Sequence, residues 1–394
     1  MSTLKEFLNK ECPDGVEYVP LWSVTIWDKK FNSVDKDKQK TIIKYKYYLA
    51  DELKQLVVEN GNVKILTTNI SNLFTLEKLV SNSLSYGEIV CIPWGGNPIV
   101  QYYKGKFITS DNRIATSIDV NKLDNKFLYY VLINKLDLIS SFYRGAGIKH
   151  PDMSKVLDII IPLPPIEVQK EIVRILDEFT EKTTKLQELL HKETVLRKKQ
   201  YEYYRNYLFN KIQSYDNVFL GDIADISVGS KPEFIYDNKT EFEYINAGTT
   251  NSGYTNNYNC LGDTVTTPSR GQGGIGYIGY QKNNFWLGAL CYQIRSNKDY
   301  ILTKYIYYYL KNNNELILKI KNSGGLPSVN RNDLIKINIK FPNLEYQKEI
   351  INILDQFDTL CNDITKGLPA EIEMRKKQYE YYRDKLLTFK EKKK

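Results

Sequence analysis

The hydrophobic pattern of the chain alternates between two long helical stretches and two mixed segments. Residues 166–208 contain no Gly or Pro, and their apolar positions recur largely at three- and four-residue steps or sums of these. This spacing predicts one long helix with a coiled-coil-like seam. At 1.5 Å per residue its length is about 64 Å. Pro164 and Pro165 mark its N-terminal end, because proline is tolerated only in the first turn.

Residues 21–160 and 220–338 have a different pattern, in which short strand-like runs mix with polar turns. Examples are residues 88–93, 246–259 and 338–340. Each segment also holds one amphipathic helix candidate, at residues 125–136 and 303–311. β-Branched residues bounded by Gly, Asn and Pro predict strands and loops. We therefore expect an α+β fold, with two domains that carry irregular mixed sheets.

An internal repeat organises the chain. Residues 197–205 read RKKQYEYYR and recur letter for letter as residues 375–383, at an offset of 178. The same offset relates residues 169–172 to 347–350, and it holds upstream to Lys126 and Lys304. The chain is therefore a tandem duplication.

Near the N-terminal end of each copy the constant offset between the copies is lost. Residues 19–21 resemble 218–220 at an offset of 199, whereas Gly87-Glu88 resembles Gly262-Asp263 at 175. The two copies are conserved in their C-terminal parts and diverge in their N-terminal parts. This suggests one scaffold that carries two different binding domains. The boundaries we assign are 1–160 for the first recognition domain, 161–210 for the first helix, 211–338 for the second recognition domain, and 339–394 for the second helix with a basic tail.

The second helix departs from the first at one place. Gly367-Leu368-Pro369 stands where the first copy has Leu189-Leu190-His191. Because an internal proline removes a helical hydrogen bond, we expect the second helix to kink or restart near residue 367. Each helix is too long to bury its seam on one small domain. The expected partner is the other helix, antiparallel about a pseudo-two-fold axis.

Composition narrows the class of protein only modestly. The formal charge of +8 over 394 residues permits a polyanionic partner without proving one. The 31 tyrosines suit an interface, although AT-rich codon bias explains them equally well. Five scattered cysteines without C-x-x-C spacing argue against disulfides and zinc. We therefore expect no metal site. No signal peptide or membrane-length apolar run is visible, so we also expect a cytoplasmic protein.

Candidate nucleic-acid contacts lie in loops that combine Gly, Asn, Arg and aromatic residues. Arg suits guanine, Asn and Gln suit adenine, and Lys suits phosphate; the alternative is an ordinary solvated loop. The first segment offers Trp94, Asn97, Lys104, Lys106, Arg113, Arg144, Lys149 and His150. The second offers Arg270, Gln272, Tyr277, Tyr280, Gln281, Lys282, Ser328, Asn330 and Arg331.

Signatures of catalysis are missing from the sequence. Residues 271–276 spell G-x-G-x-x-G, but the sequel 277–280 reads as a strand, whereas a dinucleotide site needs a helix there. Pro151-Asp152 lacks the Glu-x-Lys pair of a nuclease. Neither His150 nor His191 has a nucleophile or ligand set around it, and no P-loop or methyltransferase tetrad occurs. We therefore expect a binding protein with no catalytic residue and no cofactor of its own.

The whole chain resembles the specificity subunits of type I restriction–modification systems. The resemblance rests on the opening of residues 16–21, on Gly87-Glu88 and Gly262-Asp263, on the PLPPIEVQKEI run of residues 162–172, and on the duplicated helix motif. It implies two target-recognition domains, each reading half of a split DNA site through the major groove. The helices would set the separation and dock two modification subunits.

The resemblance also implies what those partners do. The modification subunits would methylate adenine with S-adenosylmethionine, and ATP-dependent restriction subunits would join to cleave unmodified DNA. This chain would lend specificity to both reactions and catalyse neither. The alternatives are a specificity module of another DNA-modifying enzyme and a coiled-coil scaffold without a DNA role.

The repeated helix motif is the candidate docking surface. Its residues are Arg197, Lys198, Gln200, Tyr201 and Arg205, with Arg375, Lys376, Gln378, Tyr379 and Arg383. Two identical surfaces fit two copies of one partner. The alternative is that the tyrosines close the seam between the helices. From the helical wheel we assign Tyr203 and Tyr207 to the seam and expect Tyr201 to lie on another face of the helix.

Overall fold

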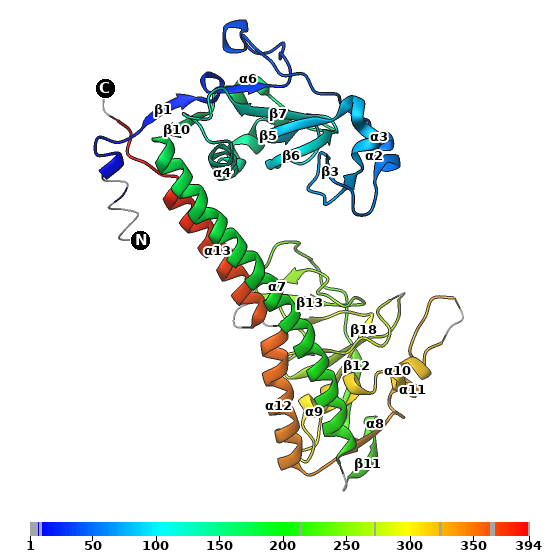
Figure 1. The fold of residues 1–394 in the computed structure, drawn as a ribbon. Helices are drawn as coiled ribbons and strands as arrows, with labels where there is room; N and C mark the ends of the chain where they lie inside the picture. The colour runs from blue at the N-terminus through cyan, green and yellow to red at the C-terminus, as the bar shows by residue number, and fades with distance from the viewer. Residues whose placement is uncertain are drawn as a thin grey trace. The chain divides into compact units, whose positions relative to one another are not determined.

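The computed structural model describes Phe7 and residues 10–212, 215–271, 273–322, 325–362 and 367–392. It divides into two compact units. Unit 1 comprises residues 1–187 and 374–394, and unit 2 comprises residues 188–373. The division cuts the long helix α7 (Ile166–Asn210), so each unit holds one variable segment, part of α7 and a helix from near the chain's end (Figure 1).

The sheet of unit 1 has six strands in the order β2-β7-β5-β6-β3-β4. They are β2 (Thr25–Trp27), β3 (Val63–Leu66), β4 (Phe74–Thr75), β5 (Ser85–Pro93), β6 (Gln101–Thr109) and β7 (Asn112–Ser117). Only β3 and β6 pair in parallel among them. Helix α4 (Asn125–Asn134) shares a hydrophobic core with β5 and with the start of α7. The amphipathic helix expected at 125–136 is confirmed.

Short elements complete unit 1. Strand β1 (Glu17–Pro20) pairs antiparallel with β10 (Ile160–Leu163), which leads into α7. Strands β8 (Tyr143–Arg144) and β9 (His150–Pro151) form a small hairpin. The remaining helices are α2 (Ala50–Leu56), α3 (Glu77–Val80), α5 (Leu136–Ser141) and α6 (Met153–Leu157), with 3-10 turns η1 (Leu21–Ser23), η2 (Lys36–Lys38) and η3 (Ser81–Ser83).

Unit 2 has a similar plan, but its strands fall into two sheets. A four-stranded sheet runs β12 (Ala224–Val228), β18 (Cys291–Ser296), β15 (Thr264–Pro268) and β16 (Gly279–Gln281). A second sheet runs β14 (Tyr254–Thr255), β13 (Phe242–Ile245) and β17 (Trp286–Leu287). β11 (Asp216–Phe219) pairs with β19 (Asn338–Phe341), as β1 does with β10. The helices are α8 (Leu220–Ile223), α9 (Thr303–Asn312), α10 (Glu315–Lys319) and α11 (Arg331–Leu334).

The sequence-based elements are largely confirmed in unit 2 as well. Helix α9 occupies the segment expected to be an amphipathic helix, and β19 covers the run at 338–340. The run 246–259 is mostly bends and irregular chain, with only Tyr254–Thr255 in a strand. Its Asn and Gly residues favour turns over a continuous ladder.

The same side chains join the long helices to the sheets in both units. Gln169 accepts a hydrogen bond from the Asp124 amide, and Gln347 accepts one from the Leu302 amide, each at 2.9 Å. Asp177 bonds Lys126 at 2.7 Å and the Tyr130 hydroxyl at 2.6 Å. Asp355 bonds Lys304 and Tyr308 at the same two distances. These repeated residues fix how each helix leaves its domain.

Each unit is closed by the repeated motif of the other copy. In unit 1, the Tyr382 ring lies 5.6 Å from Phe179, and Arg383 donates to Asn134 at 3.1 Å. In unit 2, the Tyr204 ring lies 5.5 Å from Phe357, and Arg205 donates to Asn312 at 2.9 Å. Every one of these pairs maps onto its counterpart at the offset of 178. The antiparallel pairing expected of the helices is confirmed within each unit.

The expected break in the second helix is confirmed. Helix α12 (Leu344–Asn362) ends before it, and α13 (Leu368–Leu386) begins immediately after Gly367. Pro369 thus falls in the first turn of α13, where its missing amide has no helical partner to lose. Residues 363–366 lie outside the described part of the chain.

The assignment of the seam tyrosines is wrong. Tyr203 and Tyr207 are 63% and 44% exposed, whereas Tyr201 packs against the core of unit 2. Tyr201 and Arg205 lie one turn apart on the face of α7 that meets α9 and α12. A helical wheel gives relative angles only, so the partner elements decide which stripe is buried.

No helix in the described residues is both long and apolar enough to cross a membrane.

Candidate nucleic-acid interface

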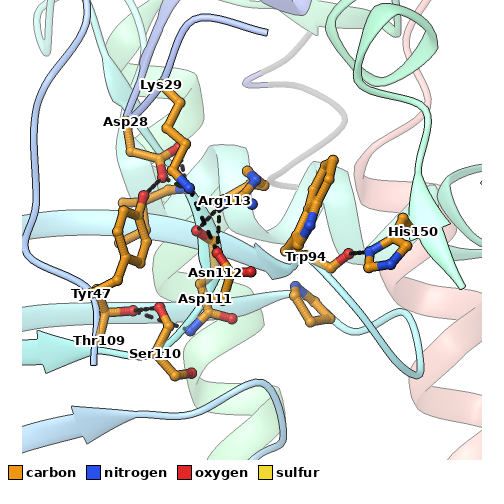
Figure 2. A network of polar contacts seen from close by, with 12 residues as sticks. Asp28, Lys29, Tyr47, Trp94, Thr109, Ser110, Asp111, Asn112, Arg113 and His150 are labelled. Carbon is orange, nitrogen blue, oxygen red and sulfur yellow. Dashed lines mark hydrogen bonds and ion pairs between the residues drawn. The ribbon is translucent and has the colours of Figure 1, made fainter. Parts of the chain in front are cut away.

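Arg113 is the centre of a polar cluster in unit 1 (Figure 2). Its side chain is 4% exposed, and its guanidinium lies 4.2 Å from the centroid of the Trp94 ring. Nη1 donates to the Asn112 carbonyl at 2.9 Å and to Asp111 at 3.1 Å. The buried Nε has no hydrogen-bond partner among the described residues. In this conformation Arg113 supports the Trp94 loop and is covered by protein.

Asp28 lies on the other side of Arg113. Its carboxylate accepts hydrogen bonds from the Ile114 amide at 3.0 Å and from the Tyr47 hydroxyl, and it lies 3.9 Å from Arg113. Burial disfavours the charged form and raises the pKa of Asp28 to about 6, although the Ile114 bond and Arg113 oppose the shift. The cluster therefore contains a carboxyl group that titrates in the weakly acidic range.

The Trp94 loop contacts the β8–β9 hairpin. The Gly96 amide donates to the Lys149 carbonyl at 3.1 Å, and His150 Nδ1 lies 2.7 Å from the Trp94 carbonyl. Because a carbonyl oxygen only accepts, Nδ1 carries the proton, and Nε2 of the neutral ring is an acceptor. Arg144 stands opposite His150 in the hairpin register, and Asn97, Arg144, Lys149 and His150 are all exposed.

Two candidates of the first segment lie away from this cluster. Lys104 pairs with Glu88 at 3.2 Å, and Lys106 pairs with Glu77 at 2.5 Å. Lys104 stands opposite Glu88, six residues before Trp94 on β5. At about 3.3 Å per residue, this places Lys104 roughly 20 Å from the Trp94 loop. The structure thus groups Trp94, Asn97, Arg113, Arg144, Lys149 and His150 and separates the two lysines from them.

In unit 2 the corresponding loops hold a different set. Arg270 and Ser328 form a bridge, and the Gly271 amide donates to the Pro327 carbonyl at 3.0 Å. Asn330 precedes α11 and is exposed. Arg331 is also exposed, but its Nε donates to the Ile226 carbonyl at 2.8 Å. The structure therefore brings Arg270, Ser328, Asn330 and Arg331 together.

The remaining candidates of unit 2 divide between a pocket and the core. Tyr277 and Gln281 line a cavity of about 170 Å³ together with Glu243, Asn251 and Thr266. Tyr280 instead packs on the Tyr307 ring at 5.4 Å and donates a hydrogen bond to Asp263 at 2.6 Å. Its counterpart Tyr102 makes the equivalent contacts with Tyr129 and Glu88. Lys282 is exposed just beyond β16, and Gln272 lies outside the described residues.

Residues 273–276 of the G-x-G-x-x-G run form a turn, and strand β16 follows. A dinucleotide site needs a helix N-terminus at this position to bind the phosphates, so the run does not have that geometry. Among the described residues, no group of three or more His, Cys, Asp and Glu is placed to hold a metal ion.

The docking candidates divide into inward and outward residues. Tyr201, Arg205, Tyr379 and Arg383 are half-buried and contact their own unit, for example through the 3.0 Å contact of the Tyr379 hydroxyl with Thr180. Lys198, Arg375, Lys376 and Gln378 are exposed. Arg197 and Gln200 are half-buried and bond each other at 2.8 Å.

Sequence reasoning missed the residues that support these loops. Asp28, Tyr47 and Asp111 are ordinary polar residues in the sequence, and only the fold brings them to Arg113 (Figure 2). The lysines of residues 29–46 were missed as well, although their excess can be counted directly in the sequence.

The family of the chain follows from comparison with known proteins. A family model described as the type I restriction modification DNA specificity domain matches twice, over residues 33–196 and 213–374. A Haemophilus influenzae protein described as a type I restriction enzyme specificity subunit is 32% identical over 84% of this chain and 89% of its own length. The chain belongs to the family of type I restriction–modification DNA specificity proteins.

A second relative agrees with this assignment, and solved structures share the fold. The specificity subunit of the Escherichia coli type I restriction enzyme EcoR124I/EcoR124II is 32% identical over 71% of this chain and 75% of its own length. The solved type I S subunit from M. genitalium shares the fold, with a TM-score of 0.52, 19% identity, and coverage of 95% of this chain and 96% of that one. A chain from a structural study of type I complex assembly and conformational transition gives a TM-score of 0.58 at 16% identity, covering 95% and 98% of the two chains.

Proposed function

We propose that each unit of this chain reads one half of a bipartite DNA target for a type I restriction–modification complex. One observation carries the proposal. Arg144 faces His150 in unit 1, and Asn322 faces Ser328 in unit 2, at positions related by the offset of 178. The same place in the same fold therefore presents different side chains, as two readers of different half-sites require.

The chemistry of the grouped residues suits base recognition. Exposed Arg144 and Arg270 can donate two hydrogen bonds to guanine, and exposed Asn97 and Asn330 can pair with adenine. The Nε2 of His150 offers an acceptor, and Lys149 suits a phosphate. Trp94 and Arg113 hold the loop that carries Asn97. We assign Arg113 to positioning this loop.

The helices are the proposed docking surface for two modification subunits. Lys198 and Tyr203 on α7 recur as Lys376 and Tyr381 on α13, and all four are exposed. Two equal surfaces fit two copies of one partner. Arg197, Gln200, Arg375 and Gln378 extend this surface, whereas the inward Tyr201, Arg205, Tyr379 and Arg383 would shape it from beneath.

We further propose that the chain catalyses no reaction itself. S-adenosylmethionine would bind to the modification subunits, and ATP-driven translocation and cleavage would belong to the restriction subunits. The proposal places the complex in the cytoplasm, where it meets the chromosome. Its support is the family membership together with the absence of catalytic motifs from the sequence.

Genome-wide mapping of N6-methyladenine tests this function. With the chain present, we expect methylation at a motif of two short half-sites separated by a fixed spacer. Deletion of the chain, with the modification gene intact, should abolish methylation at that motif. Methylation that persists unchanged after deletion would contradict the proposed function.

A further inference from the structure

The connection after β2 is the most strongly charged stretch of the first variable segment, residues 21–160. Residues 29–46 contain seven lysines and two aspartates. The rest of residues 21–160 contains 12 Lys and Arg and 12 Asp and Glu. The whole excess of positive charge in the first variable segment therefore lies in this connection.

This connection is folded against the sheet. The Gln39 side chain accepts from the Phe31 amide and donates to the Lys29 carbonyl, both at 2.9 Å. Val34 is 8% exposed, and the Ile43 amide donates to the Trp27 carbonyl at 3.0 Å. The backbone is thus held in place, and the lysines have a defined direction.

Four of its lysines are free to bind an anion. Lys30, Lys36, Lys40 and Lys44 are exposed, and their side chains have no ion pair or hydrogen bond within the part of the chain that the structure describes. Lys38 differs, because it pairs with Asp158 at 2.6 Å. With seven lysines against two aspartates, the cations of this connection repel one another, and a polyanion would relieve that repulsion.

The connection adjoins the loops that we assign to DNA reading. Lys29 lies 3.7 Å from Asp111 and 4.3 Å over the ring of Tyr47, within the Arg113 cluster (Figure 2). The Lys38–Asp158 pair ties the connection to the end of α6, which follows the β8–β9 hairpin in the sequence. The Lys29 contacts thus place this end of the connection beside the Arg113 cluster.

Unit 2 lacks this charge at the corresponding place. The connection between β12 and β13, residues 229–241, contains two lysines and three acidic residues. Its lysines are Lys231 and Lys239. The two units share a fold but differ in the sign of the charge on this connection.

We propose that residues 29–46 are a phosphate-binding clamp, so that unit 1 supplies most of the electrostatic part of DNA binding. This inference rests on the proposed function and adds an unequal division of labour between the units. Lysine contacts to phosphate position a protein on the duplex and carry no base information. The clamp would therefore hold any sequence, while the loops beside it select the half-site.

A triple substitution, Lys36→Gln, Lys40→Gln and Lys44→Gln, tests the clamp in the complex with the modification subunits. Binding to a duplex with the methylated motif and to a scrambled duplex is measured between about 50 and 200 mM salt. At about 0.9 per phosphate, the slope of log K against log salt should become shallower by about 2–3 on both duplexes. The ratio of the two affinities should stay within about twofold of wild type.

The matched control carries Lys54→Gln, Lys78→Gln and Lys122→Gln, which removes three other exposed lysines of unit 1. Its slope should stay near that of wild type, and melting curves should show both variants folded. Equal slopes in the two triple variants would overturn the clamp but leave the proposed function standing. A wild-type complex without preference for the motif would overturn the proposed function and the clamp with it.

Discussion

The Trp94 ring contacts two residues that lie far from it in the sequence. Arg113 lies against it at 4.2 Å, and the His150 ring lies 5.1 Å away (Figure 2). A guanidinium on the face of an indole is stabilised by electrostatic attraction and by the exclusion of water. Because the Trp94 carbonyl also orients His150, movement of the tryptophan would move the His150 side chain that we assign to DNA reading.

Asp28 gives unit 1 a characteristic dependence on pH. Its pKa of about 6 in the folded chain exceeds the ordinary 3.8, so the folded chain binds the proton more tightly between these values. That stabilisation is complete below about 3.8 and is lost as the pH rises through about 6.

Asp28→Asn should remove this dependence. At about 1.4 kcal/mol per pKa unit, the free energy of unfolding of wild type should fall by up to about 3 kcal/mol relative to the variant from about pH 4 to pH 7. Thermal melting across this range measures the difference. Asp37→Asn, at an exposed position, is the control. Parallel curves for wild type and Asp28→Asn would show that the buried carboxyl does not titrate there.

At the residue scale, the sequence identifies suitable chemistry better than it identifies position. Trp94, Arg144 and His150 were predicted from loop composition, and the structure brings them together. Lys104 was predicted on the same grounds, yet it pairs with Glu88 across two strands. Burial and ion pairing depend on tertiary neighbours, so residue type alone could not separate these cases.

The long helices show which element properties are local. The absence of Gly and Pro predicted α7, and Gly367 with Pro369 predicted the restart at α13. Which face of α7 is buried could not be predicted from the local sequence. Tyr201 and Tyr203 both recur in the repeat, and only the contacts with α9 and α12 show that Tyr201 lies inward.

Transferring the break to α7 tests the role of its continuity. His191 stands at the position equivalent to Pro369, inside an unbroken helix. His191→Pro should cost about 3 kcal/mol or more, because proline removes a hydrogen bond and clashes with the preceding turn. Circular dichroism and thermal melting measure the loss.

Two control substitutions accompany His191→Pro. His191→Ala should leave the helix intact, and Pro369→Ala should change stability little because that proline lies in a first turn. Equal melting temperatures for His191→Pro and His191→Ala would mean that α7 tolerates a break, contrary to the account.

At the scale of the whole molecule, the compact units do not follow the order of the sequence. Unit 1 takes α13 residues from the end of the chain, and unit 2 takes the second half of α7. The offset of 178 revealed the duplication, but it could not show that Arg205 meets Asn312 and Arg383 meets Asn134. Both repeats carry equivalent residues, so sequence alone cannot choose between pairing within a copy and pairing across copies.

The central claim is that each unit reads its own half-site, and a segment exchange tests it most directly. Residues 220–338 are replaced by the corresponding segment of another family member with a different target, and N6-methyladenine is mapped across the genome. The account predicts a new motif in which one half-site changes and the other is retained. A change in both half-sites, or retention of both in a folded and active complex, would contradict it.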